Sequence, residues 1–431
     1  MMTYFLFFLQ IMSCEREYLM KEKKWMWIGQ RISDGFLYSR ALKNIDVFFS
    51  CDDIQYKIDK IIKSFSLAKE DKIFSKKWQY TDIVQIISKF KNDIERYLHD
   101  EYNILSYYLS ESSKEELGIR HIINEKVFNC QLNRVTQYFL IKNANISLPK
   151  YMIPYGVKWN SLVKKLSYPI IMQYDKSSSC SGTFLLESEN EYLCLIKEVG
   201  EPDIAVEYIN DVVSCSSHIY ISNHDIIIFS PSVQIITKKY NLNKKYSEFS
   251  YKGNDFGLYY KLFGKDEVAY NFLYNIGLLC SKIGIRGLLG VDYMRKQDAI
   301  FFTEINFRLQ NSTSLLSFLQ NETNNVIHYI TRTKNDSETE TIKSGFQFLY
   351  NIKVNLMSGY YSINGDLISS CIDKWELLKD NVYLVFCDKN YVSANNSKNI
   401  RIIGLGSCLQ DNGNISEKII EFASILEARY E

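Results

Sequence analysis

The stretch "GVDYMRKQDAIFFTEINFRLQNSTS", residues 290–314, joins two apolar runs through a short polar turn and places an acidic side chain in each run. The runs predict a β-hairpin whose turn is centred on Gln297 and Asp298. Antiparallel pairing then puts Asp292 opposite Glu304. The apolar flanks are typical of central strands, and they argue against the alternative, an edge hairpin whose acids are merely solvated.

Oxygen-bearing side chains gather on one face of this hairpin, because the period of two puts Asn306 on the same face as Glu304. Two neighbouring carboxylates repel each other unless a cation or a proton lies between them. A hard divalent ion that binds carboxylate and amide oxygens, with phosphate oxygens completing its shell, is the Mg²⁺ type of site. Arg308 adds a cation on that face for a phosphoryl group or an anionic substrate.

The composition is that of a folded globular protein, with 431 residues of which 46% are hydrophobic and 23% charged. The formal charge of +1 gives no overall field that favours nucleic acid or an anionic membrane, so we expect neither as a partner. The ten cysteines show no CxxC spacing and no compact disulfide framework. A reducing, cytoplasmic location is therefore predicted.

The opening run "MMTYFLFFLQIM" is apolar but lacks a basic flank and is shorter than the ~20 residues that span a bilayer. We interpret residues 1–20 as an N-terminal segment and not as a membrane anchor. A signal peptide and a misassigned start codon are the alternatives, so whether this segment belongs to the mature protein stays open.

Hydrophobic periodicity divides the rest of the chain. Strands "WMWIGQ" and "IDVFFSC" with helical spacing around them predict an α/β unit, and "DIVQIISKFKNDIERYL" predicts an amphipathic helix. A new unit begins near residue 126 and opens with a helix in "NCQLNRVTQYFLIKNANI". The polar run "TRTKNDSETETIKSG" predicts a linker, after which we expect a hairpin turn at Asn364-Gly365 and a final helix over residues 416–429.

Strands and a helix fill the middle of the chain. "YPIIMQYD" and "TFLLES" predict two strands joined by the flexible loop "KSSSCSG". "DIAVEYI", "SHIYIS" and "DIIIFSPSVQIIT" continue as strands, and residues 265–284 predict a helix.

These motifs carry a family likeness. "GLLGVDY" and "IFFTEINFRLQ" resemble the closing metal-binding signature of the ATP-grasp superfamily, an Asp in a Gly-x-Asp-aromatic strand followed by Glu-x-Asn-x-Arg. "YPIIMQYDKSSSCSGTFLLES" is similar to its strand, phosphate-covering loop and strand, and "IAVEYI" to its adenine hinge. "NRVTQYFLIKNANISLP" is similar to the helix that opens the core. Four motifs in the right order make the resemblance far more specific than any one of them.

The resemblance implies an α+β fold with ATP between two subdomains of an ATP-grasp core in residues 126–330. It also implies an N-terminal α/β domain of the pre-ATP-grasp type in residues 21–125. A linker and a small C-terminal α+β domain would occupy residues 331–431.

Residue by residue, the resemblance makes Asp292, Glu304 and Asn306 the Mg²⁺ ligands and places Arg308 near the transferred phosphoryl group. The expected ATP-binding residues are Arg134, Gln173 and Lys176, the lid Ser177, Ser178, Ser179, Ser181 and Gly182, and the hinge Glu207, Tyr208 and Ile209. Arg286 is a candidate for binding the acyl-accepting substrate, with a solvated arginine at a strand start as the alternative.

The sequence departs from the family pattern at four places. Asn133-Arg134 replaces the usual Asp-Lys pair, and Gln173 replaces a phosphate-contacting lysine whose charge Lys176 could supply. Val213, with Ser214 beside it, replaces a ribose-binding glutamate. Ser312 stands where biotin carboxylases carry an acidic residue.

The resemblance implies an ATP- and Mg²⁺-dependent carboxylate-amine ligase that forms an amide or peptide bond through an acyl phosphate. Its substrates would be a small-molecule or peptide carboxylate and an amine, and a homodimer is compatible with this assignment. A degenerate, non-catalytic nucleotide-binding protein is the alternative that Gln173 and Val213 keep open. An ATP-dependent carboxylase is a further alternative, which Ser312 weakens.

Overall fold

A computed structural model describes most of the chain between residues 24 and 420. The described residues are 24–29, 31–39, 41–42, 45–51, 63–67, 81–107, 132–175, 180, 182–241, 246–320, 325–331, 345–352, 359–361, 383–387, 398–405, 407–412, 414–417 and 420. Residues 1–20, the Asn364-Gly365 turn and nearly all of the expected final helix lie outside them.

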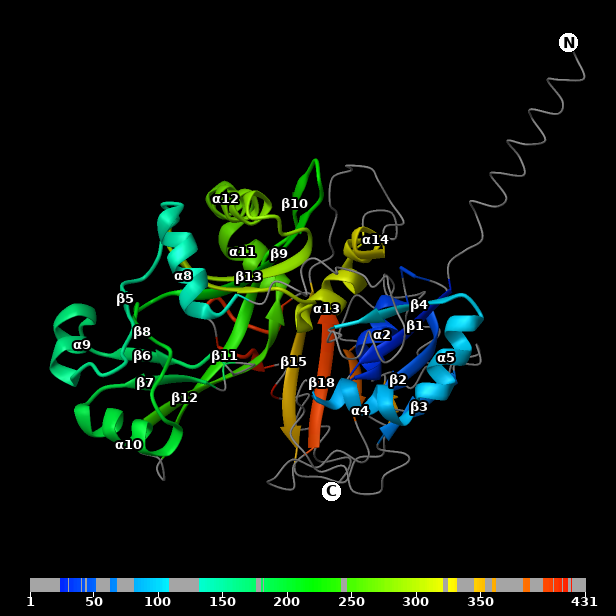
Figure 1. Cartoon of the computed structure of the whole chain (residues 1–431), viewed down its shortest axis with the longest axis horizontal. Coiled ribbons are helices and arrows are strands. Elements are labelled where there is room, and N and C mark those ends of the chain that lie inside the picture. The colour runs from blue at the N-terminus through cyan, green and yellow to red at the C-terminus, as the bar shows by residue number, and fades with distance from the viewer. Residues whose placement is uncertain are drawn as a thin grey trace, which may run out of the picture.

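The N-terminal part forms a four-stranded sheet of parallel strands in the order β3-β2-β1-β4 (Figure 1). The two strands predicted here are confirmed as β1 and β2. The elements are β1 (Lys24–Gly29), α2 (Ile32–Tyr38), β2 (Ile45–Ser50), β3 (Lys63–Ser66), α4 (Thr81–Lys89), α5 (Lys91–His99) and β4 (Tyr102–Ser106). Because β1 has β2 on one side and β4 on the other, the chain changes direction beside β1, at the kind of position where α/β sheets bind ligands.

The helix predicted in "DIVQIISKFKNDIERYL" is two helices, which meet at Phe90. Phe90 leaves the helical conformation with φ −109° and ψ 22°, and its side chain packs against Phe49 and Phe65. Packing of this aromatic side chain into the core therefore accompanies a break that the apolar spacing alone did not predict.

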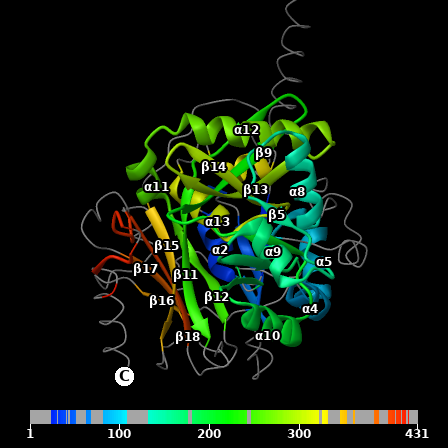
Figure 2. The same ribbon diagram turned by 90° about the vertical axis from the view of Figure 1, so that its left-hand side faces the viewer.

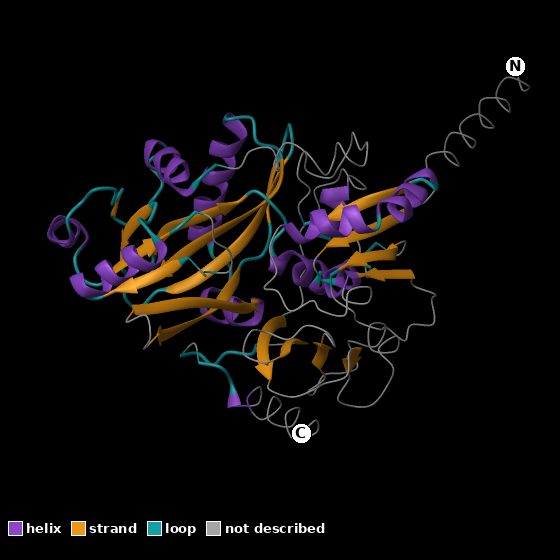
Figure 3. Cartoon of the chain, turned by 60° about the horizontal axis from the view of Figure 1, so that its bottom comes forward, coloured by secondary structure: helices purple, strands orange, loops and turns teal. Residues whose placement is uncertain are grey.

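The rest of the chain builds a 14-stranded sheet whose main path is β14-β13-β9-β11-β12-β15-β18-β17-β16. A branch through β7, β6, β8 and β5 leaves it at β12. The strands are β5 (Tyr151–Met152), β6 (Ile170–Gln173), β7 (Thr183–Leu186), β8 (Ile204–Glu207), β9 (Val213–Ile221), β10 (Ile226–Ile228), β11 (Ser232–Asn241), β12 (Tyr246–Asp255), β13 (Gly287–Lys296), β14 (Ala299–Asn306), β15 (Gly345–Ile352), β16 (Gly359–Tyr361), β17 (Tyr383–Cys387) and β18 (Lys398–Leu405). Figure 3 shows the two sheets as separate groups of strands.

Seven helices among the described residues pack around this sheet. They are α8 (Arg134–Asn143), α9 (Trp159–Leu166), α10 (Glu189–Val199), α11 (Phe256–Phe263), α12 (Glu267–Lys282), α13 (Asn311–Leu319) and α14 (Val326–Thr331). Figure 2 shows α12 lying across β9, β13 and β14, while α9 and α10 cover the branch strands. Helix α13 packs against α2, and it therefore lies between the large sheet and the N-terminal sheet (Figure 1).

The predicted hairpin is formed by β13 and β14, which join at Gln297 and Asp298. Gln297 has a φ of 49°, the left-handed conformation that tight hairpin turns require. Strand β13 is also paired with β9 on its other side, so it is a central strand, as its apolar flanks predicted.

Asp292 pairs with Glu304 as predicted, but a β-bulge is responsible. Strict counting outward from the turn would have set Thr303 opposite Asp292. The register shifts between Asp292 and Tyr293, which adds one residue to β14 and brings Glu304 into place. The predicted pairing is therefore confirmed, although the feature that produces it was not foreseen.

The division of the chain into domains remains a prediction. The structure adds that β15 pairs with β12, so the described C-terminal strands continue the sheet of the core. None of the helices in the described ranges has the length and apolar character that crossing a bilayer would require.

Candidate active site

A cavity of about 410 Å³ lies between the branch strands β6 to β8 and the strands β9, β11, β12, β13 and β14. This volume is within the usual range for small-molecule sites. Its apolar wall comprises Tyr138, Ile171, Val206, Tyr208, Ile209, Val212, Ile236, Phe249, Tyr251, Tyr293 and Met294. The other lining residues are Arg134, Gln173, Cys180, Thr183, Glu207, Ser214, Ser216, Gln234, Asn254, Asp292, Thr303, Glu304, Asn306, Arg308, Gln310, Asn311 and Ser312.

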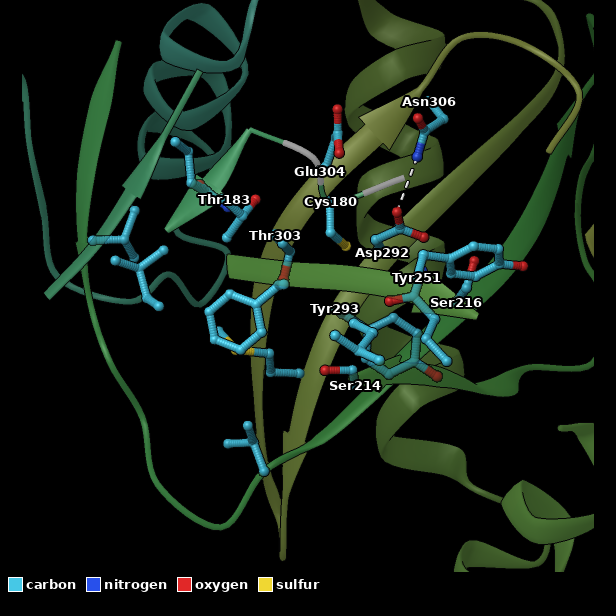
Figure 4. Close-up of a pocket in the computed structure, with 18 of the residues that line it drawn as sticks. Cys180, Thr183, Ser214, Ser216, Tyr251, Asp292, Tyr293, Thr303, Glu304 and Asn306 are labelled. Atoms are coloured by element: carbon cyan, nitrogen blue, oxygen red, sulfur yellow. Dashed lines mark hydrogen bonds between the residues drawn. The ribbon is translucent and has the colours of Figure 1, made fainter. Parts of the chain in front are cut away.

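Asp292 is held at both carboxylate oxygens. Asn306 Nδ2 donates to Oδ2 at 3.0 Å, a bond drawn in Figure 4, and Gln310 Nε2 donates to Oδ1 at 3.2 Å. Burial raises the pKa of Asp292 to about 6, with a further contribution from the neighbouring Glu304 carboxylate. Because Asn306 uses its nitrogen on Asp292, its amide oxygen remains to face a cation.

Glu304 lies beside the first residue of α8. Arg134 Nη2 lies 3.1 Å from Glu304 Oε2, and the exposed fractions of the two side chains are 7% and 31%. Burial by itself would lower the pKa of Arg134, but Glu304, Asp175 and other neighbouring groups together outweigh burial and raise it. The Arg134 backbone N–H also donates to Asp175 Oδ1 at 2.8 Å, which fixes the start of α8 against the end of β6.

The donor set of this region fits Mg²⁺. Asp292, Glu304 and Asn306 line one cavity and offer carboxylate and amide oxygens. Among the described residues, no group of three or more His, Cys, Asp or Glu side chains could hold a metal ion. A divalent ion here would therefore need additional ligands, such as the phosphate oxygens of a nucleotide.

Three buried polar atoms of the cavity lining have no hydrogen-bond partner within the part of the chain that the structure describes. They are Arg134 Nε, Gln173 Oε1 and Thr303 Oγ1. Buried polar atoms are nearly always satisfied, so unpaired ones that line a cavity are what a polar ligand would satisfy. The bulge that shifts the register also carries Thr303 into this lining next to Glu304 (Figure 4).

Gln310 is a site residue that the sequence did not reveal. Besides contacting Asp292, its side chain accepts a hydrogen bond from Ser216 Oγ at 3.1 Å. Because Ser216 donates to Oε1, the amide is oriented with its nitrogen toward Asp292. Gln310 also precedes α13, and a reciprocal capping interaction with Thr313 fixes it there. The sequence contains little indication of this role, because nothing in a single sequence shows that Ser216 on β9 contacts the residue before α13.

The expected hinge residues Glu207, Tyr208 and Ile209 all line the cavity. The Glu207 side chain is committed elsewhere: Oε1 accepts from the Lys150 backbone N–H at 2.7 Å, and Oε2 lies 3.5 Å from Lys150 Nζ. Recognition of a base at this hinge would therefore rely on backbone N–H and C=O groups.

Of the other predicted site residues, the structure brings three to the cavity. Arg134, Gln173 and Arg308 are part of the lining, and so is Ser214, whereas Val213 is not. The predicted lid residues Lys176, Ser177, Ser178, Ser179 and Ser181 lie outside the described residues. Gly182 is described but does not line the cavity; its carbonyl accepts from the Tyr174 backbone N–H at 3.0 Å.

Arg286, like Gly182, is a predicted residue that the structure places outside the cavity lining. Its Nη1 donates to the carbonyls of Ser281 and Ile285 at 2.9 and 2.7 Å. Arginine side chains near a helix C-terminus commonly donate to backbone carbonyls, and Ser281 lies in the last turn of α12, so these hydrogen bonds account for the position of Arg286. A role in binding the acyl acceptor has no support from this geometry.

Cys180 lies beside the acidic pair (Figure 4). Burial raises the pKa of its thiol to about 12, and the Asp292 and Glu304 carboxylates add to the effect. A thiol with so high a pKa stays protonated at neutral pH, so Cys180 is poorly suited to act as a nucleophile.

The family model of the ATP-grasp domain matches residues 133–312. The fold of the chain is therefore that of the ATP-grasp proteins. The matched segment contains the acidic hairpin, the hinge and Arg134, so the ATP-grasp match coincides with the cavity.

Solved structures share this ATP-grasp fold over nearly the whole chain. The biotin carboxylase domain of the Hydrogenobacter thermophilus 2-oxoglutarate carboxylase, solved with MgADP, ADP and bicarbonate, matches with a TM-score of 0.59, 11% identity and coverage of 89% of this chain and 86% of that chain. Staphylococcus aureus N5-carboxyaminoimidazole synthetase with ADP matches with a TM-score of 0.55 and 12% identity, and the match covers 95% of this chain and 98% of that chain. The L-amino acid ligase of Bacillus licheniformis matches with a TM-score of 0.52 and 10% identity, and the match covers 95% of this chain and 98% of that chain. No curated protein matches the sequence.

Proposed function

We propose that this protein is an ATP- and Mg²⁺-dependent ligase that joins a carboxylate to an amine through an acyl phosphate. The observation that carries the proposal is the convergence of Asp292, Glu304 and Asn306, together with Arg134 and Arg308, on a cavity that the adenine hinge also lines. Such a site would hold the nucleotide base by its hinge and the phosphates by its charged groups.

In the first step, an oxygen of the substrate carboxylate attacks the γ-phosphorus of ATP, and the bond to the β,γ-bridging oxygen breaks, so that ADP leaves. When bound, Mg²⁺ would neutralise negative charge on the phosphate oxygens. Arg134 and Arg308 supply N–H donors for the phosphoryl oxygens, and the planar guanidinium suits two parallel hydrogen bonds. No protein nucleophile is required.

In the second step, the amine nitrogen attacks the acyl carbon, and inorganic phosphate leaves with the electron pair of the broken C–O bond. The amine loses a proton as the amide forms. Apart from Asp292, Glu304 and the Lys150-bound Glu207, no carboxylate lines the described cavity. We therefore expect the amine to attack in its neutral form, with its proton passing to solvent or to phosphate.

Ser312 favours an amine over bicarbonate as the second substrate. It is buried and lines the cavity at the position where the resemblance to biotin carboxylases would call for an acidic residue. Two of the structural neighbours are a biotin carboxylase domain and a carboxyaminoimidazole synthetase, so bicarbonate is included in the substrate panel of the test.

The proposal also includes small-molecule or peptide substrates and a cytoplasmic location. Six described cysteines without a disulfide support the cytoplasmic location.

A specific observation keeps non-catalytic nucleotide binding as the second candidate. Gln173 supplies no charge where relatives carry a lysine, and its buried Oε1 has no partner among the described residues. If this candidate holds, the protein binds ADP tightly yet releases no phosphate with any substrate.

The test is to measure ADP and phosphate release from ATP with panels of carboxylates, amines and bicarbonate. We expect release only when a carboxylate and an amine are both present. Glu304→Gln should abolish turnover, because it removes one negative charge from the metal site at nearly constant volume. Asp298→Asn, which removes an exposed acid from the turn of the same hairpin, should leave turnover unchanged. Full activity in Glu304→Gln would refute the metal assignment.

A further inference from the structure

The ion pair between Arg134 and Glu304 places a protein cation on a carboxylate that the proposed function assigns to Mg²⁺. Arg134 is the first residue of α8, and its side chain is buried. The contact of 3.1 Å between Nη2 and Oε2 is that of a charge-assisted hydrogen bond. Arg134 and the proposed Mg²⁺ ion therefore compete for the single negative charge of Glu304.

Metal binding at this site depends on the charge of Glu304. The described residues contain no cluster of three acidic, His or Cys ligands, so Asp292 and Glu304 supply the charge of the site. A guanidinium on one oxygen of Glu304 would lie close to a cation on the other, and the two positive charges repel each other at low effective dielectric. Binding of a divalent ion is therefore opposed for as long as Arg134 stays on Glu304.

Arg134 also has the capacity to bind a second anion. Its Nε is buried without a hydrogen-bond partner among the described residues, and the oxygen of Asp175 nearest to it lies 3.9 Å away, too far for a hydrogen bond. The side chain lines the cavity in which phosphates would bind. A phosphate group would offer Arg134 the bidentate partner that Glu304 does not provide through its single 3.1 Å contact.

We propose that Arg134 acts as a positioning residue that couples the two ligands: a nucleotide phosphate draws it from Glu304 and so releases Glu304 to the metal ion. The inference rests on the proposed binding of Mg²⁺ and nucleotide in this cavity. The coupling is reciprocal by linkage, so the metal raises nucleotide affinity by the same factor as the nucleotide raises metal affinity.

The first experiment measures binding rather than turnover. Mn²⁺ binding to the full chain is followed by electron paramagnetic resonance with and without saturating ADP. Arg134→Met, which removes the charge and keeps a side chain of comparable length, should bind Mn²⁺ alone about tenfold more tightly than the original protein, and ADP should improve its Mn²⁺ affinity by a correspondingly smaller factor. Arg308→Met removes a cation from the same lining and is the matched control.

A second pair of variants tests the ion pair from its other end and guards against misfolding of Arg134→Met. ADP affinity is measured calorimetrically in excess chelator at about pH 8, above the pKa of about 6 of Asp292. Glu304→Gln should bind metal-free ADP several-fold more tightly, because Arg134 is released to the phosphates. Asp292→Asn removes an equal charge from a residue that does not pair with Arg134, so its gain should be clearly smaller.

Equal Mn²⁺ affinities in Arg134→Met and the original protein would overturn the inference. Equal gains in Arg134→Met and Arg308→Met, or in Glu304→Gln and Asp292→Asn, would also overturn it, because general charge rather than the ion pair would then be responsible. In each of these cases Mn²⁺ and ADP still bind, so the proposed function stands. If the original protein binds neither Mn²⁺ nor ADP, the proposed function fails, and the inference fails with it.

Discussion

Gln310 lies across the α-carbon of Gly290, so close that a Cβ built on Gly290 would come within 2.0 Å of the Gln310 side chain. The same side chain contacts Asp292 and Ser216. The absence of a side chain at Gly290 is therefore what allows one amide to connect β9, β13 and the start of α13.

Gly290→Ala should displace Gln310 and release one oxygen of Asp292. Overpacking of this kind costs about 1–3 kcal/mol, and we expect weaker Mn²⁺ binding in the presence of ADP. The double variant Gly290→Ala/Gln310→Ala removes the collision, so it should bind Mn²⁺ no more weakly than Gln310→Ala alone. Strictly additive losses would show that Gly290 matters for a reason other than Gln310.

Gln173→Lys should strengthen nucleotide binding. The new ammonium group would enter a cavity in which Arg134 and Arg308 are the described cations of the lining. A gain of about tenfold in ADP affinity, or ~1.4 kcal/mol, is expected by calorimetry. Gln173→Met provides the uncharged control of similar size and should bind ADP no better than the original protein. If Gln173→Lys is as weak as Gln173→Met, phosphates do not pass near this position.

Asp34→Asn should destabilise the fold without touching the cavity. Asp34 is fully buried on α2 and accepts from Arg401 Nη1 at 2.7 Å, while Arg31 Nε lies 3.2 Å away. Burial alone would raise the pKa of Asp34, but the two arginines and the neighbouring hydrogen-bond donors together outweigh burial and lower the pKa. Removing the charge leaves Arg401 buried without its counter-ion, at a cost of about 3–5 kcal/mol.

Urea unfolding monitored by circular dichroism measures this loss. Asp46→Asn serves as the control, because Asp46 is exposed and its partner is the Tyr102 hydroxyl at 3.1 Å. The midpoint should fall for Asp34→Asn and stay nearly constant for Asp46→Asn. Equal midpoints would mean that the ion pairs of Asp34 contribute nothing net.

Because His218 is buried, we expect the free energy of unfolding to fall in mild acid. Burial lowers its pKa to about 3, and Nε2 lies 2.9 Å from Thr313 Oγ1. In the unfolded chain the pKa is about 6.5, so between these values only the unfolded state is protonated. The contribution of His218 is present above about pH 6.5 and falls by up to ~1.4 kcal/mol per pH unit as the pH drops toward 3.

His218→Gln should therefore make the free energy of unfolding less dependent on pH between about 4 and 6. The slopes of the free energy of unfolding against pH are compared rather than its absolute values, because the substitution also changes the contact with Thr313. His224→Gln, at an exposed position, should keep the original slope. Identical slopes in His218→Gln and the original protein would contradict the buried, neutral histidine.

The sequence predicted the elements whose causes are local. The hairpin turn at Gln297 and Asp298 and the strands "WMWIGQ", "IDVFFSC", "YPIIMQYD" and "TFLLES" all follow from apolar alternation and turn residues. The family likeness added the expected adenine hinge, which no periodicity could have assigned.

What the sequence missed depends on contacts between distant residues. The bulge at Thr303 arises where β14 meets β13, and Gln310 reaches Asp292 only after α13 has packed. A single sequence does not show that Arg286 would donate to the carbonyls of Ser281 and Ile285. Tertiary context decided each of these positions.

The most direct test of the central claim is a crystal structure of the protein with ADP and Mn²⁺, measured at a wavelength where Mn²⁺ scatters anomalously. We expect one strong anomalous peak between the side-chain oxygens of Asp292 and Glu304, with ADP phosphates adjacent and the base at the Glu207–Ile209 hinge. A nucleotide bound outside this cavity, or Mn²⁺ that contacts neither carboxylate, would contradict the account.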